Sequence, residues 1–317
     1  MKIVTIVLLL LVFAISLPAQ NLPTVASGKI VRIENFPSTL IAPRNVDVWL
    51  PEGYSTEKKY AVLYMHDGQM LFDSATTWNK QEWGVDETLS KLIAEKKIRD
   101  CIVVGVWNSK TRHSDYFPQK PFESLSKAKQ DTVMHGQRSN NQALFSQAIQ
   151  SDKYLQFLVT ELKPFIDSAY STLQDQSNTF IAGSSMGGLI SMYAICEYPA
   201  VFGGAACLST HWPGVFMSKG NPVPAAFMRY LKTHLPSPKN HLIYFDYGTT
   251  TLDSLYKPFQ KQADAIMKAK GFASRGNAAN WMTKEFVGAN HSEAAWRQRL
   301  AIPMLFLLQN REEKPRR

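Results

Sequence analysis

A serine lies at the centre of Gly183-Ser184-Ser185-Met186-Gly187, which fits the pattern G-x-S-x-G. In that pattern the serine occupies a sharp turn between a strand and a helix, and the flanking glycines let the backbone turn without Cβ clashes. The turn exposes the serine hydroxyl, and the N–H groups that begin the helix face any negative charge developing beside it. The spacing therefore predicts that Ser185 is a nucleophile, although an ordinary Gly/Ser turn would also fit the pattern.

The residues around this motif support the first interpretation. A β-branched and aromatic segment, 179–182, precedes it, and an apolar segment follows it as far as Tyr198, where Pro199 ends the helix. We therefore expect the strand, turn and helix that a nucleophilic serine of this kind requires.

A serine hydroxyl needs a general base, and three histidines follow Ser185 at a sufficient distance in the chain. His234 lies late in an expected helix and His241 opens an expected strand, where a structural histidine is unremarkable. His291 instead lies in the loop 288–292 between the last strand and the last helix, so its ring can reach over the edge of a sheet. We expect His291 to be the base.

Two acids could orient that histidine, and both come from one part of the chain. Asp246 lies within the expected strand 241–247, and Asp253 follows the turn 248–251. A residue in the loop beyond a strand is freer to face a histidine, which favours Asp253, although an acid at a helix start is also common for structural reasons. Asp246 remains the alternative.

An oxyanion hole for this chemistry needs two backbone donors. Met186 follows the nucleophile and supplies one N–H, and the loop 66–69 after an expected central strand supplies the other through Gln69. His66 precedes the serine and is expected to shape that loop. His211 follows another strand and is a candidate for the lining of the pocket, without an assigned role.

The elements that must position these residues alternate between strand and helix. Continuous apolar runs of strand length, typical of central strands buried on both faces, alternate with helical periodicity after an opening of alternating strands. This order predicts one doubly wound α/β domain over residues 20–317, with a mostly parallel sheet and antiparallel N-terminal strands. The expected strands are 29–36, 46–50, 60–65, 101–106, 179–182, 204–208, 241–247 and 281–287, and the expected helices are 85–97, 154–166, 186–198, 225–235, 252–266 and 293–308.

The segment 109–151 interrupts this alternation, because it is polar and longer than an ordinary connection. It leaves a strand at the carboxyl edge of the sheet, where ligands of such folds bind. We expect a lid or substrate loop rather than a disordered segment.

The first nineteen residues resemble a secretory signal. Lys2 precedes an apolar run from Ile3 to Leu17, and Pro18-Ala19-Gln20 offers a cleavage point. The run of about fifteen apolar residues is shorter than the roughly twenty of a spanning helix, which argues against an uncleaved anchor. The expectation is a cleaved signal over 1–19, a secreted or periplasmic protein and no membrane span after cleavage.

Charge and cysteines limit the possible partners. The net charge is +9, but the basic residues are scattered, so nucleic acid is not an expected partner. The three cysteines (Cys101, Cys196 and Cys207) lie in apolar runs without metal-ligand spacing to a histidine. Buried free thiols are expected, with one disulfide as the alternative, and a metal site is not expected.

The chain resembles the putative-esterase family of α/β hydrolases, which includes enterochelin (siderophore) esterases, feruloyl and acetyl-xylan esterases, S-formylglutathione hydrolase and mycolyltransferases. The segments that carry the resemblance are Val46-Asp47-Val48-Trp49-Leu50-Pro51-Glu52-Gly53-Tyr54, Val62-Leu63-Tyr64-Met65-His66-Asp67-Gly68, Gly183-Ser184-Ser185-Met186-Gly187-Gly188 and Gly288-Ala289-Asn290-His291. The turn 248–253 departs most from the family.

The resemblance implies an α/β-hydrolase fold and a cofactor-free serine esterase that acts through an acyl-enzyme. Its substrate would be a small-molecule or glycan-linked ester, and export favours siderophore or polysaccharide esters. The alternatives are an inactive hydrolase fold that binds a glycan or siderophore, and an acyltransferase of the same fold.

Overall fold

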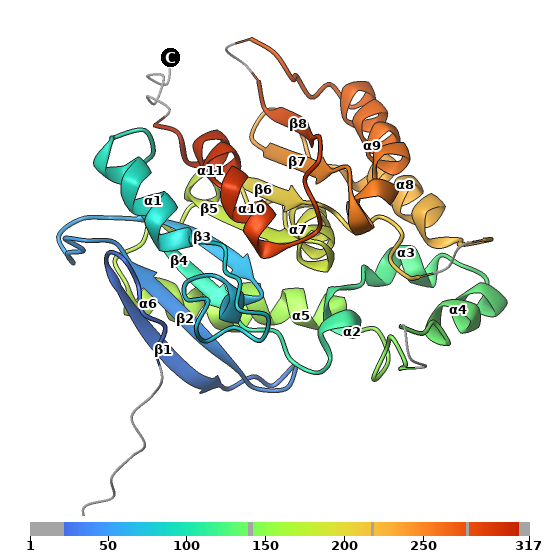
Figure 1. Ribbon diagram of the computed structural model, residues 1–317, viewed down its shortest axis with the longest axis horizontal. Coiled ribbons are helices and arrows are strands. Elements are labelled where there is room, and N and C mark those ends of the chain that lie inside the picture. Colours follow the sequence, from blue (N-terminus) through green and yellow to red (C-terminus); the bar gives the residue numbers. More distant parts are fainter. Residues whose placement is uncertain (1–21, 139–141, 217–218, 277–278, 311–317) are drawn as a thin grey trace, which may run out of the picture.

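An eight-stranded sheet in the order β1-β2-β4-β3-β5-β6-β7-β8 runs through the protein (Figure 1). The first two strand pairs, β1 with β2 and β2 with β4, are antiparallel, and all later neighbours are parallel. The prediction of a mostly parallel sheet with antiparallel N-terminal strands is thereby confirmed. The strands are β1 (Lys29–Phe36), β2 (Arg44–Leu50), β3 (Ala61–His66), β4 (Cys101–Val106), β5 (Thr179–Ser184), β6 (Gly204–Leu208), β7 (Leu242–Gly248) and β8 (Trp281–Phe286).

The computed structural model describes residues 22–138, 142–216, 219–276 and 279–310. The expected signal segment, 1–19, lies outside the described residues. Within them, no helix is both long and apolar enough to cross a membrane.

Helices cover both faces of the sheet because the side chains of a strand alternate between its two faces. In the buried strand β3, Val62 and Tyr64 join the core beneath α5, α7 and α8, whereas Leu63 and Met65 join the core beneath α1, α10 and α11. The helices are α1 (Val85–Ala94), α2 (Arg112–Tyr116), α3 (Gln119–Glu123), α4 (Lys127–Met134), α5 (Ser151–Phe157), α6 (Lys163–Ala169), α7 (Met186–Glu197), α8 (Val223–His234), α9 (Lys257–Ala269), α10 (Glu293–Arg299) and α11 (Ala301–Leu308).

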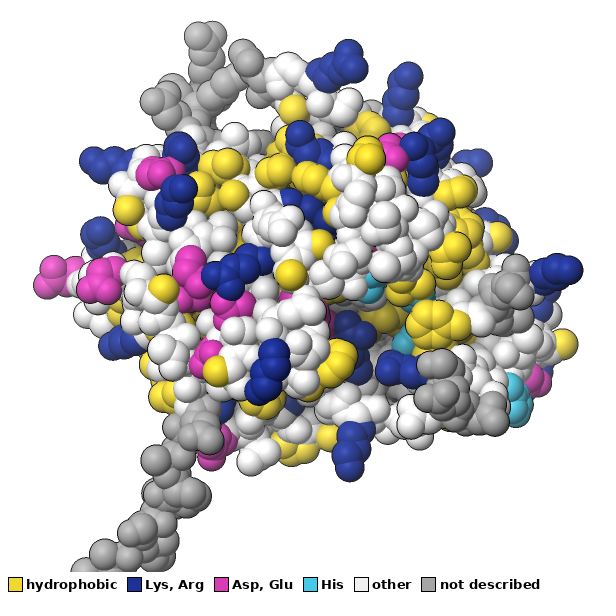
Figure 2. Space-filling model, viewed as in Figure 1, with side chains coloured by type: hydrophobic (Ala, Val, Ile, Leu, Met, Phe, Trp, Pro, Cys, Tyr) yellow, Lys and Arg dark blue, Asp and Glu magenta, His cyan; other side chains and the backbone are white. Residues whose placement is uncertain are grey.

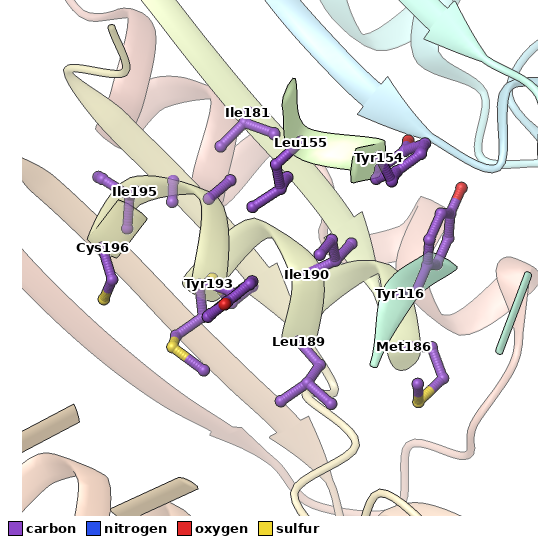
Figure 3. Close-up of a cluster of buried hydrophobic side chains, with 14 of the residues drawn as sticks. Tyr116, Tyr154, Leu155, Ile181, Met186, Leu189, Ile190, Tyr193, Ile195 and Cys196 are labelled. Atoms are coloured by element: carbon purple, nitrogen blue, oxygen red, sulfur yellow. The ribbon is translucent and has the colours of Figure 1, made fainter. Parts of the chain in front are cut away.

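Helix α7 is buried on all sides, since every residue from Met186 to Cys196 is buried. A helix that is apolar all round belongs in a core rather than at a surface. Figure 3 shows its side chains beside Leu155 of α5 and Ile181 of β5. The helix that follows the nucleophile motif is therefore held rigidly against the sheet.

The segment 109–151 is a helical insertion rather than an extended loop. It contains α2, α3 and α4 and buries Tyr116, Phe117 and Val133 in the main core. Helix α2 packs on α5 and α7, and α3 packs on α8. Helices of five to eight residues are marginal alone, so tertiary packing explains why sequence periodicity does not reveal them.

The expected last helix is two helices, α10 and α11, which meet at Leu300. Pro303 has no N–H to donate to the carbonyl of Arg299 four residues earlier, and its ring crowds that carbonyl, so the first helix ends there. The three cysteines are buried and free, as predicted.

Candidate active site

Ser185 stands at the turn between β5 and α7 in a strained conformation, with φ 57° and ψ −120°. A residue other than glycine rarely adopts a positive φ, and such strain is common at functional sites. The turn is too tight for side chains at its glycines. A Cβ on Gly183 would lie 2.7 Å from the carbonyl of Gly187, and one on Gly188 would lie 2.9 Å from the carbonyl oxygen of Leu208.

The acid and the base predicted for this site are in contact. Nδ1 of His291 lies 2.5 Å from Oδ1 of Asp253. The other oxygen of Asp253 accepts hydrogen bonds from the hydroxyl of Ser209 at 2.5 Å and from the N–H of Gly248 at 2.6 Å. Burial raises the pKa of Asp253, but the hydrogen bond and charge of His291, with the other two donors, outweigh burial and leave the pKa below its usual value. The carboxylate is therefore ionised and aimed at the histidine.

Asp246, the alternative acid, faces a different partner. Its two oxygens bind the guanidinium of Arg299 at 3.0 and 3.1 Å, and they also accept from Tyr244 and from the N–H of Ser209. Burial raises the pKa of Asp246. The structure thus brings Asp253, and not Asp246, to His291.

Ser209 joins these two acids and has no assignment in the sequence analysis. Its hydroxyl donates to Asp253 and accepts from Nε1 of Trp296 at 3.0 Å and from the guanidinium of Arg299 at 2.9 Å. The residue has a positive φ of 41°. Its place directly after β6 is its only signal in the sequence, because its partners lie 37 to 90 positions further along the chain.

The two expected oxyanion donors occupy different positions. Met186 is the first residue of α7, where the backbone N–H has no acceptor within the helix, and it lines the same cavity as Ser185. Gln69 lies in the 3₁₀ turn η1 (Gly68–Met70) directly after β3. This loop abuts the start of α7, since a Cβ on Gly187 would lie 3.3 Å from a carboxylate oxygen of Asp67. Gln69 itself is not one of the described residues that line the cavity.

Two adjoining cavities open beside Ser185. The first has a volume of about 500 Å³ and the second about 820 Å³, and His211, Phe216 and Leu252 line both. Figure 2 shows histidine, basic and hydrophobic side chains around a hollow on this face. The other residues of the first cavity are Arg112, His113, Arg138, Ser185, Met186 and His291, and those of the second are Pro213, Val215, Asn221, Pro224, Ala225, Ser254, Leu255, Pro258, Phe259 and Gln262.

The insertion 109–151 supplies the basic part of the first cavity. Arg112 makes a bidentate ion pair with Asp67, at 2.6 and 2.7 Å, and Arg138 lines the cavity beside it. The insertion therefore contributes side chains to the site, in keeping with the expectation of a substrate loop.

Three other histidines, His66, His234 and His241, have structural positions. Nδ1 of His66 lies 2.8 Å from the hydroxyl of Tyr154, and burial is the main cause that lowers the pKa of His66 to about 3, so the ring is a neutral part of the core. His234 stacks on Tyr230, and His241 bonds to backbone carbonyls at the other end of β7.

The three residues follow the chain order of the triad in α/β hydrolases. The serine lies at a strand–helix turn, the acid follows a later strand, and the histidine follows the last strand. The chain matches the model of the family described as "Putative esterase" over residues 38–307. It belongs to that family, and its fold is the expected α/β-hydrolase fold.

Known proteins similar to the chain are distant in sequence. An uncharacterised protein of Bacillus subtilis (strain 168), YbbA, is 25% identical over 171 residues, which cover 53% of this chain and 58% of YbbA. The chain therefore spans little more than half the length of that relative.

Two solved structures share the fold. The feruloyl esterase module from Clostridium thermocellum, in a mutant complexed with sinapinate, has a TM-score of 0.62 at 16% identity, covering 93% of each chain. The enterobactin esterase from Shigella flexneri, in the presence of 2,3-dihydroxy-N-benzoyl-glycine, has a TM-score of 0.61 at 15% identity, covering 90% of this chain and 60% of its own.

Proposed function

We propose that this protein is an exported serine hydrolase that cleaves carboxylic esters through an acyl-enzyme. The observation that carries the proposal is the contact between His291 and the buried, ionised Asp253 beside a cavity that Ser185 lines. Membership of the esterase family supports the same reaction.

Each proton that moves in the proposed reaction has an acceptor. Ser185 Oγ attacks the ester carbon while His291 Nε2 takes the hydroxyl proton, and Asp253 stabilises the imidazolium through Nδ1–H. The N–H of Met186, with that of Gln69 as the second donor, stabilises the oxyanion. His291 then gives its proton to the departing alkoxide, leaving an acyl-serine. Water attacks that ester by the same steps in reverse and releases the acid and Ser185.

The cavities suggest an ester with one substantial apolar half. The second cavity is lined largely by apolar side chains, among them Val215, Leu255 and Phe259, which suits an aromatic or other apolar group. A protein of the same fold, a feruloyl esterase module, was solved in complex with sinapinate, which supports an aromatic acyl group for this chain. Siderophore and polysaccharide-linked esters carry such groups, and they are substrates that suit an exported enzyme.

Hydrolysis of p-nitrophenyl acetate by the wild type and by Ser185→Ala tests the activity. A fall of at least about a thousandfold in kcat is expected for the variant, because no other group in the site replaces the nucleophile. Equal rates would refute the proposal. Failure of the folded wild type to react with a fluorophosphonate would favour an inactive binding protein, and transfer of the acyl group to an added alcohol in place of water would favour an acyltransferase.

Export is tested by the mass of the protein recovered outside the cytoplasm of an expressing bacterium. Cleavage after Ala19 predicts a mature chain that begins at Gln20. Full-length protein in the cytoplasm would contradict export.

A further inference from the structure

A second histidine, His211, lies in the site, and the mechanism above does not use it. It follows β6, its backbone N–H donates to the carbonyl of Ser185 at 3.1 Å, and its side chain is buried with 1% exposure. Nδ1 of its ring lies 2.8 Å from the hydroxyl of Tyr256. The backbone of His211 is thus tied directly to the nucleophile, and its ring to a buried phenol.

Tyr256 stands between the two imidazoles of the site. Its ring meets those of His211 and His291 edge to face, each at a centroid distance of 5.9 Å, and its backbone N–H donates to the carbonyl of Asp253. Burial raises the pKa of Tyr256, and an interaction of its hydroxyl with the side chain of Ser185 opposes that rise. One phenol hydroxyl therefore links the ring of His211 to the nucleophile.

The other ring nitrogen of His211 is unsatisfied. Among the described residues Nε2 has no hydrogen-bond partner, although the atom is buried and the ring lines both cavities. A buried polar atom without a partner is destabilising, and in a native structure it usually indicates a water or ligand. Because the ring of His211 lines both cavities, a bound ester is the natural partner of Nε2.

The protons on Ser185, Tyr256 and His211 determine whether Nε2 of His211 donates or accepts. Burial, together with the nearby His113, His291 and Arg112, lowers the pKa of His211 well below its usual value, so the ring is neutral and carries one proton. Ser185 must give its single proton to His291 during the attack, so its oxygen can only accept from Tyr256. The phenol then donates to Ser185 and accepts from Nδ1–H of His211, which leaves a lone pair on Nε2.

We propose that His211 is a specificity residue, whose Nε2 accepts a hydrogen bond from a hydroxyl or N–H group of the substrate, and that Tyr256 positions Ser185. Only one hydroxyl separates the ring from the nucleophile, so the substrate donor lies within a few bonds of the ester carbon. This acceptor selects esters that carry a hydroxyl or N–H donor close to the ester group, on either the acyl or the alcohol side. The inference rests on the proposed hydrolase function and narrows its substrate.

Two pairs of esters test the donor on either half of the substrate: methyl mandelate against methyl phenylacetate, and 2-hydroxyethyl benzoate against ethyl benzoate. The wild type is expected to prefer the hydroxylated member of at least one pair by about tenfold or more in kcat/KM, after correction for alkaline hydrolysis rates, because the other member leaves Nε2 unpaired.

Two substitutions separate the functions of the two ring nitrogens. His211→Asn keeps a polar group near Tyr256 but removes the atom at the Nε2 position, so the preference should disappear. His211→Gln places an amide oxygen near that position and should retain a preference of at least about threefold. His135→Asn, at an exposed histidine in the insertion, is the matched control and should keep the full preference.

Tyr256→Phe tests the positioning role separately. It should lower kcat about tenfold on both members of a pair while changing KM less than about twofold, since it removes only the hydroxyl that faces Ser185. An unchanged kcat would overturn this role.

The preference is a ratio within one protein sample, so partial unfolding, which lowers both rates alike, does not change it. Turnover without discrimination by the wild type, or discrimination that survives in His211→Asn, overturns the role of His211 alone. Absence of turnover of all four esters and of p-nitrophenyl acetate would instead refute the hydrolase function and this inference with it.

Discussion

Nδ1 of His291 and Oδ1 of Asp253 are 2.5 Å apart although 38 positions separate the two residues in the chain. Asp253 lies in the 3₁₀ turn η5 (Thr251–Leu255) that follows β7, and His291 follows β8. These strands are parallel neighbours, so the segments that leave them begin at the same edge of the sheet. A hydrogen bond from the N–H of His291 to the hydroxyl of Thr251 ties the two segments together at 2.9 Å.

This contact predicts the effect of Asp253→Asn. The amide cannot stabilise an imidazolium and favours the wrong tautomer of His291, so kcat should fall by roughly two to four orders of magnitude with the fold retained. Steady-state kinetics on p-nitrophenyl acetate, with melting curves matched to the wild type, measure this. A loss smaller than about fivefold would remove Asp253 from the mechanism.

Asp246→Asn is the matched comparison and should act mainly on stability. It removes one partner of a buried ion pair and leaves the guanidinium of Arg299 with the more distant carboxylate of Asp253, at 3.9 Å. Loss of one partner of a buried pair typically costs about 3–5 kcal/mol. Activity per folded molecule should stay within about tenfold of the wild type, because Asp246 does not contact His291. A larger activity loss in folded Asp246→Asn than in Asp253→Asn would reverse the assignment of the acid.

Ser209→Ala should weaken the site through Asp253. The substitution removes one donor to the carboxylate and leaves the donors of Trp296 and Arg299 without their shared acceptor. We expect a loss of about 1–3 kcal/mol in the free energy of unfolding and a fall in kcat of about tenfold, with KM little changed. Ser191→Ala is the control, because among the described residues that buried hydroxyl bonds only to the carbonyl of Gly187 within its own helix. Equal effects of the two substitutions on kcat would contradict a positioning role for Ser209.

The environment of Asp86 predicts how the free energy of unfolding depends on pH. One of its oxygens accepts from the N–H of Ala26, but burial, together with the neighbouring carboxyl of Glu87, raises the pKa of Asp86 to about 7. The folded state therefore binds a proton that the unfolded state has released. The stability from this proton is fully present below the unfolded pKa of about 4 and is lost as the pH rises through about 7.

Asp86→Asn removes that charge and should be more stable than the wild type at pH 8 by about 1–2 kcal/mol, or roughly 2–6 °C in Tm. The difference should shrink at pH 5, where the carboxyl is protonated in the fold. Thermal unfolding at both pH values measures it, and an equal shift at both would contradict the raised pKa.

The local pattern of the sequence is sufficient to predict the strands, the nucleophile turn and the chain order of the candidate triad. Buried parallel strands are continuous apolar runs, and the glycines around Ser185 are required by a turn with no room for a Cβ. These features depend on residues close together in the chain, which is why composition and spacing predict them.

Only the tertiary structure decides which acid reaches His291. On β7, Tyr244 faces the core that contains α10 and α11, and Asp246, two residues later, shares that face and meets Arg299. Asp253, beyond the strand, is free to turn toward the histidine. The sequence shows both carboxylates and cannot show which of them accepts the hydrogen bonds of the buried Arg299.

The same holds for the contacts that link Ser209, His211 and Tyr256 to the site. Each joins loops that leave different strands, and nothing in the neighbourhood of any one of these residues indicates its partner. The short helices of the insertion likewise depend on packing against α5, α7 and α8. Sequence determines which groups are available at the edge of the sheet, whereas the packing of the loops there determines which groups meet, because hydrogen bonds between distant segments depend on positions that only the folded chain defines.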